Sequence, residues 1–190
     1  PSWEDPGETG DKKILKIDPG HVFGTGTHET TRLCIEFIEN YVKDGDKVLD
    51  IGCGSGILSI ASLLLGAGHA DAVDIDPNAV DIAYTNAGMN GIGKDVYTVV
   101  SGNILLDEEL DKQYSGKKYD VVEANIVADV IIALTEKIPE YIKKGGIFIS
   151  SGIIVERLDD VLDALKNAGF EVLEVNRDKG WAAIASKYNN

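Results

Sequence analysis

Several kinds of residue are scarce in this 190-residue sequence, and each scarcity excludes a class of protein. The two cysteines, Cys34 and Cys53, do not form a close pair, so no disulfide framework is indicated and we expect a cytoplasmic protein. No run of eighteen apolar residues occurs, so we expect no membrane-spanning helix. The three scattered histidines and two separated cysteines give no metal-ligand spacing, so we expect no metal site.

Basic residues are also in short supply. The chain has 18 Lys and Arg against 32 Asp and Glu, which gives a formal net charge of −14. A protein that binds a nucleic-acid backbone needs Lys and Arg to neutralise phosphates, so we expect no direct nucleic-acid binding. An acidic surface attracts cations and is compatible with a basic protein partner, although such a charge also serves simply to keep a protein in solution. No feature indicates the oligomeric state.

Short apolar runs alternate with amphipathic segments along most of the chain. The runs predict strands at 47–51, 70–75, 95–102, 119–126, 146–151, 170–177 and 180–188. The pattern turns helical after Gly26, with an apolar face over 33–42, and further helices are predicted over 57–67, 77–91, about 129–138 and about 155–168. Residues 1–13 are polar and rich in Pro and Gly, which is typical of a linker, and 14–190 form the expected domain.

This alternation predicts an α/β fold with a doubly wound, mostly parallel seven-stranded sheet. The last two runs are separated by Asp178-Lys179-Gly180, a hairpin signal, so the last strand is expected to be antiparallel. Open sheets of this kind bind ligands beyond the carboxyl ends of their strands. We therefore expect the functional residues in the loops that follow strands.

A glycine-rich loop follows the first predicted strand. In "LDIGCGSGIL", Gly52 and Gly54 allow a tight turn and let the backbone approach a ligand, although such loops also occur for packing alone. A triphosphate-binding loop needs a lysine that is absent here, and a dinucleotide fingerprint needs glycine where Ile57 stands. Asp50 precedes the loop, and a carboxylate suits a cationic ligand better than a pyrophosphate.

Polar residues follow the next two strands. Asp74 ends the second strand at the distance from the glycines where a ribose is bound, with helix capping as its alternative role. Asp76 is expected to cap the helix that starts at Pro77. Asn103 follows the third strand, where its amide would contact adenine or its side chain would form a turn. A cationic adenosine derivative without phosphate fits these features, which favours S-adenosylmethionine as the cofactor.

Three segments together resemble one enzyme family. These are "DPGHVFGTGTHETT", "VLDIGCGSGILSIA" and "EANIVADVI". The glycine loop alone would suit any class I, Rossmann-like methyltransferase. With the other two segments, the chain resembles the PrmA-type methyltransferases that modify large-subunit ribosomal protein eleven. The sequence departs from the family pattern at Glu29, where proline is usual, and at Glu123, where valine is common.

The resemblance implies roles for particular residues. The segment that contains Phe23 and Thr25 would fold over the cofactor, and Thr31 would contact it. Gly52 would lie under the methionine moiety, Asp74 would hold the ribose, and Asn125 would sit at the edge of the active site. The resemblance also implies a basic ribosomal protein as substrate. It implies that the family's N-terminal recognition domain is missing from this chain, which would begin in the linker after it.

The expected chemistry is methyl transfer to an amino group, either of lysine side chains or of an N-terminal amine. An amine gains positive charge in this reaction, so carbonyl oxygens aimed at it stabilise the transition state. The side-chain oxygen of Asn125 and the backbone carbonyl of Ile126 are the candidates. His28 is a candidate general base, although a histidine at the start of a helix also has a structural role. Without a ligand, "FGTGTHETT" would be only a helix N-terminus capped by Thr27.

Three other functions stay open at this point. The same chemistry would serve another protein lysine or a small amine. An NAD-dependent oxidoreductase is disfavoured by Ile57 in the glycine loop. A non-catalytic module that only binds the cofactor would not depend on Asn125.

Overall fold

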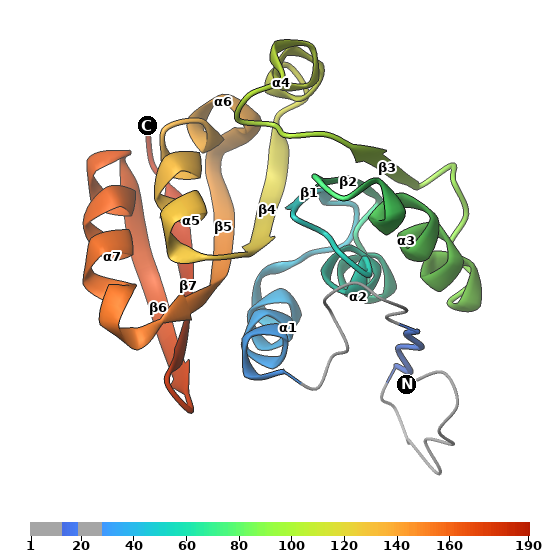
Figure 1. The fold of residues 1–190 in the computed structure, drawn as a ribbon, viewed down its shortest axis with the longest axis horizontal. Helices are drawn as coiled ribbons and strands as arrows, with labels where there is room; N and C mark the ends of the chain where they lie inside the picture. The colour runs from blue at the N-terminus through green and yellow to red at the C-terminus, as the bar shows by residue number, and fades with distance from the viewer. Residues whose placement is uncertain (1–12, 19–27) are drawn as a thin grey trace.

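A single seven-stranded sheet organises the residues that the structure describes, 13–18 and 28–190 of a computed structural model. The strands are β1 (Lys47–Ile51), β2 (His69–Asp74), β3 (Tyr97–Ser101), β4 (Tyr119–Asn125), β5 (Ile142–Ile154), β6 (Phe170–Asp178) and β7 (Trp181–Tyr188). Their order across the sheet is β3-β2-β1-β4-β5-β7-β6 (Figure 1). β7 runs antiparallel to both neighbours, and the remaining pairs are parallel. The predicted doubly wound sheet with an antiparallel last strand is confirmed.

Helices cover both faces of this sheet. One face carries α1 (Glu29–Tyr41), α2 (Ile57–Leu65) and α3 (Pro77–Met89). The other carries α4 (Glu108–Ser115), α5 (Ala128–Thr135), α6 (Ile138–Tyr141) and α7 (Leu158–Asn167), which is preceded by the 3₁₀ turn η1 (Val155–Arg157). None of the helices in the described part of the chain is long and apolar enough to cross a membrane.

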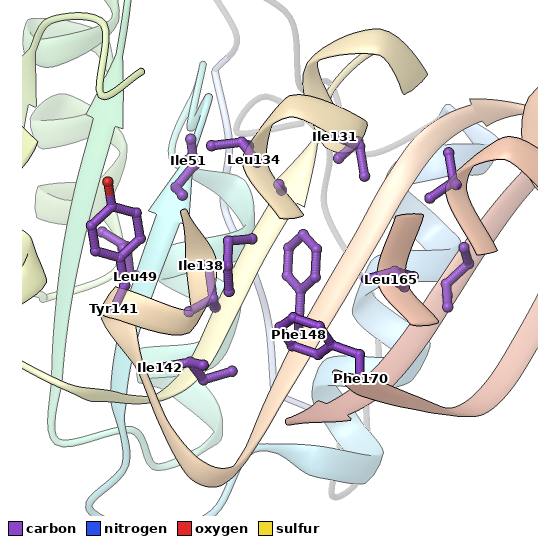
Figure 2. Close-up of a cluster of buried hydrophobic side chains, with 14 of the residues drawn as sticks. Leu49, Ile51, Ile131, Leu134, Ile138, Tyr141, Ile142, Phe148, Leu165 and Phe170 are labelled. Atoms are coloured by element: carbon purple, nitrogen blue, oxygen red, sulfur yellow. The ribbon is translucent and has the colours of Figure 1, made fainter. Parts of the chain in front are cut away.

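Alternation along the central strands divides the core into two clusters. Val48 packs with α1 and α2, whereas the next residue, Leu49, packs with α6 on the opposite face. Figure 2 shows this second cluster, in which Ile131 and Leu134 of α5 lie over Phe148 of β5. Because both faces are covered, β1, β2 and β4 are buried at nearly every position, and even the carboxyl groups of Asp50, Asp71 and Glu123 are buried.

Several parts of the fold differ from the predicted elements: α6 was not predicted, and β5 ends at Ile154, three residues later than predicted. Helix α4 was not predicted, because only Leu110 and Tyr114 of its eight residues are buried and an apolar period is therefore weak. Strand β5 begins at Ile142, four residues earlier than predicted, and its pairing with β4 shifts between Tyr119 and Val121. The exposed residues Lys143 to Gly145 hide this early start in the sequence.

The strand order of the sheet reverses at the boundary between β1 and β4. Strands β1, β2 and β3 follow one another toward one edge, whereas β4 lies on the other side of β1 and leads to β5. The loops that leave β1 and β4 therefore diverge to opposite faces, and the crevice between them is where open sheets of this type bind ligands.

Candidate active site

The glycine loop and the start of the β4–α5 loop touch each other at this crevice. Gly52 has φ of +79°, a conformation that L side chains rarely adopt, and a Cβ there would lie 2.5 Å from Cγ2 of Ile126. Any side chain at position 52 would therefore push Ile126 away. Glycine is needed here both for the backbone conformation and for the close approach.

Backbone N–H groups of the glycine loop donate hydrogen bonds to other groups of the protein. Gly52 and Cys53 donate to the carbonyl oxygen of Val73 at 2.8 and 3.2 Å. Gly54 donates to a carboxylate oxygen of Asp74 at 2.8 Å, and Gly56 donates to Cys53 at 2.8 Å. A phosphate-binding loop instead points such groups at its ligand. This geometry agrees with a ligand that has no phosphate.

Asp74 connects the glycine loop to the end of β2. Its second carboxylate oxygen accepts from the N–H of Asp76 at 2.9 Å, and Asp76 in turn caps α3 by accepting from Asn78 N at 2.9 Å. The predicted cap at Asp76 is confirmed. Each Asp74 oxygen has a second lone pair, so the carboxylate can also accept from a ligand hydroxyl. Its assignment to ribose stays a prediction.

A cavity of about 720 Å³ opens beside these loops. The predicted catalytic and cofactor-binding residues that line it are Gly52, Gly54, Asp74, Asn103, Asn125 and Ile126, and His28, the candidate general base, lines it as well. Phe23 and Thr25, together with the expected cap Thr27, lie outside the described residues. Residues more than seventy positions apart thus meet at one cavity whose size suits a nucleoside-sized ligand.

Asn103 occupies its predicted place with its side chain engaged locally. Its side-chain oxygen accepts from the N–H of Leu105 at 3.0 Å, which makes the turn that the sequence also allowed. The residue lines the cavity as well, so the turn holds it there. Contact with adenine stays a prediction.

Asn125 ends β4 at the floor of the cavity. Its amide nitrogen donates over 3.4 Å to the hydroxyl of Thr31, while its oxygen Oδ1 is buried and has no hydrogen-bond partner among the described residues. Thr31 is fully buried behind Asn125 and is absent from the described cavity lining. Thr31 therefore supports Asn125, and its predicted cofactor contact is untested. The carbonyl oxygen of Ile126 lies against Gly152, where a Cβ would approach it to 2.4 Å.

One wall of the cavity joins the start of α1 to the start of β7, and His28 is the member of this wall that was singled out from the sequence. The wall is formed by His28, Thr30 and Trp181, and the rings of His28 and Trp181 meet edge to face with centroids 5.2 Å apart. His28, not Thr27, is the N-cap of α1, and its Nδ1 accepts from Thr30 N at 3.3 Å. Nothing in the local sequence links Trp181, at the start of β7, to His28, because the two residues are far apart in the chain and the fold brings them together.

Apolar residues at the rim were also missed. Ile75 follows β2 directly, Val127 stands two residues after the end of β4, and the two residues are 73% and 64% exposed. Val130 of α5 lines the same side. Isolated exposed aliphatic residues are common on protein surfaces, so the sequence offered no reason to select them.

Asp50 does not face the cavity, which corrects its interpretation as a group that attracts a cationic ligand directly. The side chain is fully buried and points to α2, where Oδ2 accepts from the backbone N–H of Ser59 at 3.2 Å and from its hydroxyl at 2.5 Å. The alternation of β1 explains this, since Leu49 and Ile51 point to the other face.

Comparison with known proteins identifies the family. Residues 1–189 match the family model described as "Ribosomal protein L11 methyltransferase (PrmA)". The chain belongs to the PrmA family. A ribosomal protein L11 methyltransferase of Clostridium botulinum is 46% identical over 187 residues, which are 98% of this chain and 57% of that protein. This PrmA-family chain thus spans little more than half the length of the curated relatives it matches.

Solved structures agree with this assignment. A ribosomal protein L11 methylase from Lactobacillus delbrueckii subsp. bulgaricus is 31% identical, with a TM-score of 0.87, over 100% of this chain and 93% of that one. A putative methyltransferase complexed with SAH, SMU.776, is 12% identical, with a TM-score of 0.72, over 85% and 50% of the two chains. The second likeness concerns the fold, which is that of class I S-adenosylmethionine-dependent methyltransferases.

Proposed function

We propose that this PrmA-family chain is the catalytic part of an S-adenosylmethionine-dependent methyltransferase acting on amino groups of ribosomal protein L11. The observation that carries the proposal is Asn125. Its side-chain oxygen, at the end of β4, is buried and has no hydrogen-bond partner among the described residues, and it lies at the same cavity as the glycine loop. Residues 14–190 are the proposed catalytic domain and 1–13 a linker.

The residues around the cavity fit S-adenosylmethionine. Gly52 and Gly54 line the cavity where its methionine part would lie, Asp74 would hold the ribose hydroxyls, and Asn103 would lie near the adenine. When bound, the cofactor supplies a methyl group activated by a sulfonium. The backbone N–H groups of Gly52, Cys53 and Gly54 donate to Val73 and Asp74 and do not point at a ligand phosphate. This agrees with a cofactor without phosphate and disfavours NAD.

The protein's own part in the reaction is to position and desolvate the acceptor amine. Oδ1 of Asn125 would accept an N–H of the amine and stabilise the charge that develops on it. Val127, Val130 and Trp181 surround that end of the cavity with apolar surface. An apolar environment disfavours an ammonium ion and so favours the neutral amine that the reaction needs. His28 is the imidazole on this wall that could take up the released proton.

The substrate assignment depends on the family and on charge. The relatives are named as methyltransferases of ribosomal protein L11, and the net charge of −14 favours encounter with a basic protein. The cavity itself would also accept another lysine or a small amine, so the acceptor must be tested directly.

Two experiments test this function. The chain is first titrated by calorimetry with S-adenosylhomocysteine and, separately, with NAD. We expect one-to-one binding of the first and no heat from the second, and binding of NAD alone would overturn the cofactor assignment. Purified ribosomal protein L11 is then incubated with the chain and S-adenosylmethionine, and its intact mass is measured. A mass gain on free lysine or on an unrelated basic protein, with none on L11, would replace the proposed substrate.

A further inference from the structure

Two buried carboxyl groups lie side by side beneath the glycine loop. Asp50 of β1 and Glu123 of β4 are partners in the register of the parallel pair, and both side chains are fully buried. Register partners on adjacent strands, roughly 4.8 Å apart, project to the same face of a sheet. Asp50 stands two residues before Gly52, and Glu123 stands two residues before Asn125, so the pair lies directly behind the site.

Each carboxyl has one oxygen bonded to α2 and one left over. Oδ2 of Asp50 accepts twice from Ser59, and Oε1 of Glu123 accepts from the hydroxyl of Ser62. The remaining oxygens, Oδ1 of Asp50 and Oε2 of Glu123, are buried without a hydrogen-bond partner among the described residues. Two unpaired carboxylate oxygens at neighbouring positions would be costly if both groups were ionised.

The surroundings offer no positive charge to compensate. Neither carboxyl has an ion pair in the described part of the chain. The other titratable groups that act on them come from α1, the glycine loop, β2 and β3, namely Cys34, Cys53, Asp74 and Tyr97. The residues of α2 that donate hydrogen bonds to them are Ser59 and Ser62. Burial raises the pKa of both carboxyls, and the charge of Asp50 raises the pKa of Glu123 further.

We propose that Asp50 and Glu123 share one proton between Oδ1 and Oε2 and act as a single, singly charged positioning pair for the glycine loop. The shared proton supplies the donor that both unpaired oxygens lack. The pair ties β1, β4 and α2 together just behind the contact of Gly52 with Ile126. Loss of the proton would leave two adjacent buried negative charges. Their repulsion would separate the loop after β1 from the loop after β4, which are the two sides of the cofactor site.

The pair should make stability depend on pH in a definite direction. An unfolded glutamate loses its proton near its ordinary pKa of 4.5, whereas the folded pair keeps one proton to higher pH. The folded state then binds more protons than the unfolded state, so stability falls as pH rises through this range. The unfolding equilibrium shifts by up to about tenfold per pH unit until the folded pair loses its proton.

Two substitutions imitate the protonated pair permanently. Glu123→Gln and Asp50→Asn each place an amide N–H where the shared proton lies, and each keeps one negative charge. We expect either variant to lose most of the pH slope of stability above about pH 5 and to be more stable than the natural chain at alkaline pH. Glu136→Gln, at an exposed glutamate, is the matched control and should keep the natural slope.

Denaturant unfolding from about pH 5 to about pH 9 measures the slope, and infrared spectroscopy of the natural chain detects the un-ionised carboxyl near neutral pH. We expect one such band, absent in Glu123→Gln. Equal slopes in the natural chain and in both variants, or no un-ionised carboxyl near neutral pH, would overturn the proposal. If both variants fail to fold, the infrared result decides.

A third measurement, affinity for S-adenosylhomocysteine across the same pH range, rests on the proposed function. Affinity should fall about tenfold at alkaline pH in the natural chain and stay level in Glu123→Gln. A loss of equal size in both proteins would show that the pair does not position the loop. Absence of binding at every pH would count against the proposed cofactor alone, since the unfolding and infrared results do not use it.

Discussion

Gly52 shows how far the site depends on a single residue. Its backbone has positive φ, and the space that a side chain would fill is occupied by Ile126. The contact joins the loop after β1 to the loop after β4, which are the two sides of the cofactor site. A change of one methyl group at this position therefore acts on both loops together.

Gly52→Ala should weaken cofactor binding strongly. The positive φ costs about 1–2 kcal/mol and the overlap with Ile126 about 1–3 kcal/mol more. We expect affinity for S-adenosylhomocysteine, measured by calorimetry, to fall at least about tenfold because Ile126 moves. Gly45→Ala is the control, since Gly45 has φ of +83° with nothing within 4 Å of a Cβ. Gly45→Ala should lose only the stability that the positive φ costs, and its affinity for S-adenosylhomocysteine should be unchanged. Equal loss of affinity in both variants would contradict the role of the Ile126 contact.

Asn125→Ala should impair methyl transfer more than cofactor binding. Removing one preorganised polar group from an active site costs about 10²–10³ in rate. We therefore expect kcat for ribosomal protein L11 to fall by about that factor, while the dissociation constant of S-adenosylhomocysteine changes only a few fold. Radiolabel transfer under saturating cofactor measures the rate. An unchanged rate would remove Asn125 from the mechanism and favour a module that only binds the cofactor.

Between elements, the start of α1 and the β6–β7 hairpin act as one wall. Lys179 in the hairpin pairs with Glu29 at 2.7 Å, and Arg32 of α1 pairs with Asp178 at 2.7 Å. These pairs are exposed and individually contribute little to stability. Trp181 and His28, whose rings meet edge to face, both line the cavity.

Trp181→Ala should therefore affect the acceptor more than the cofactor. Loss of the indole opens the apolar wall to water, so we expect kcat/KM for L11 to fall about tenfold or more while cofactor affinity changes little. Lys179→Gln lies in the same hairpin and removes one exposed ion pair, so it should leave steady-state kinetics unchanged. If the two variants lose the same activity, the hairpin as a whole, and not the indole, would be responsible.

For the whole molecule, the acidic surplus is the dominant electrostatic feature. A net charge of −14 on one domain produces self-repulsion that opposes the compact state. The described ion pairs are mostly exposed or half-exposed and offset only part of it. The same charge favours approach of a basic substrate.

Added salt should consequently stabilise the fold. Raising ionic strength from about 0.01 M to about 0.5 M shortens the screening length several-fold, so the thermal midpoint should rise by about 2–5 °C. Calorimetric scans in NaCl and in KCl at equal ionic strength should agree, because screening depends on ionic strength alone. A falling midpoint would mean that attractive pairs outweigh the repulsion.

Much of this organisation was already determined by the sequence. Short apolar runs and helical periods are local properties, so the strand at 47–51, the α/β order and the antiparallel last strand followed from them. Asp76 before Pro77 carried its own capping signal. Polar segments without such a period, as in α4, could not be recognised.

Only the tertiary structure decided which distant residues meet. The place of β4 beside β1 makes Glu123 the neighbour of Asp50 and sets Ile126 on Gly52, and the turn of β7 carries Trp181 to His28. Strand order and register depend on packing across the whole core, and no local pattern encodes them. The sequence therefore determined the loops that could bind a ligand, and the fold decided what surrounds it.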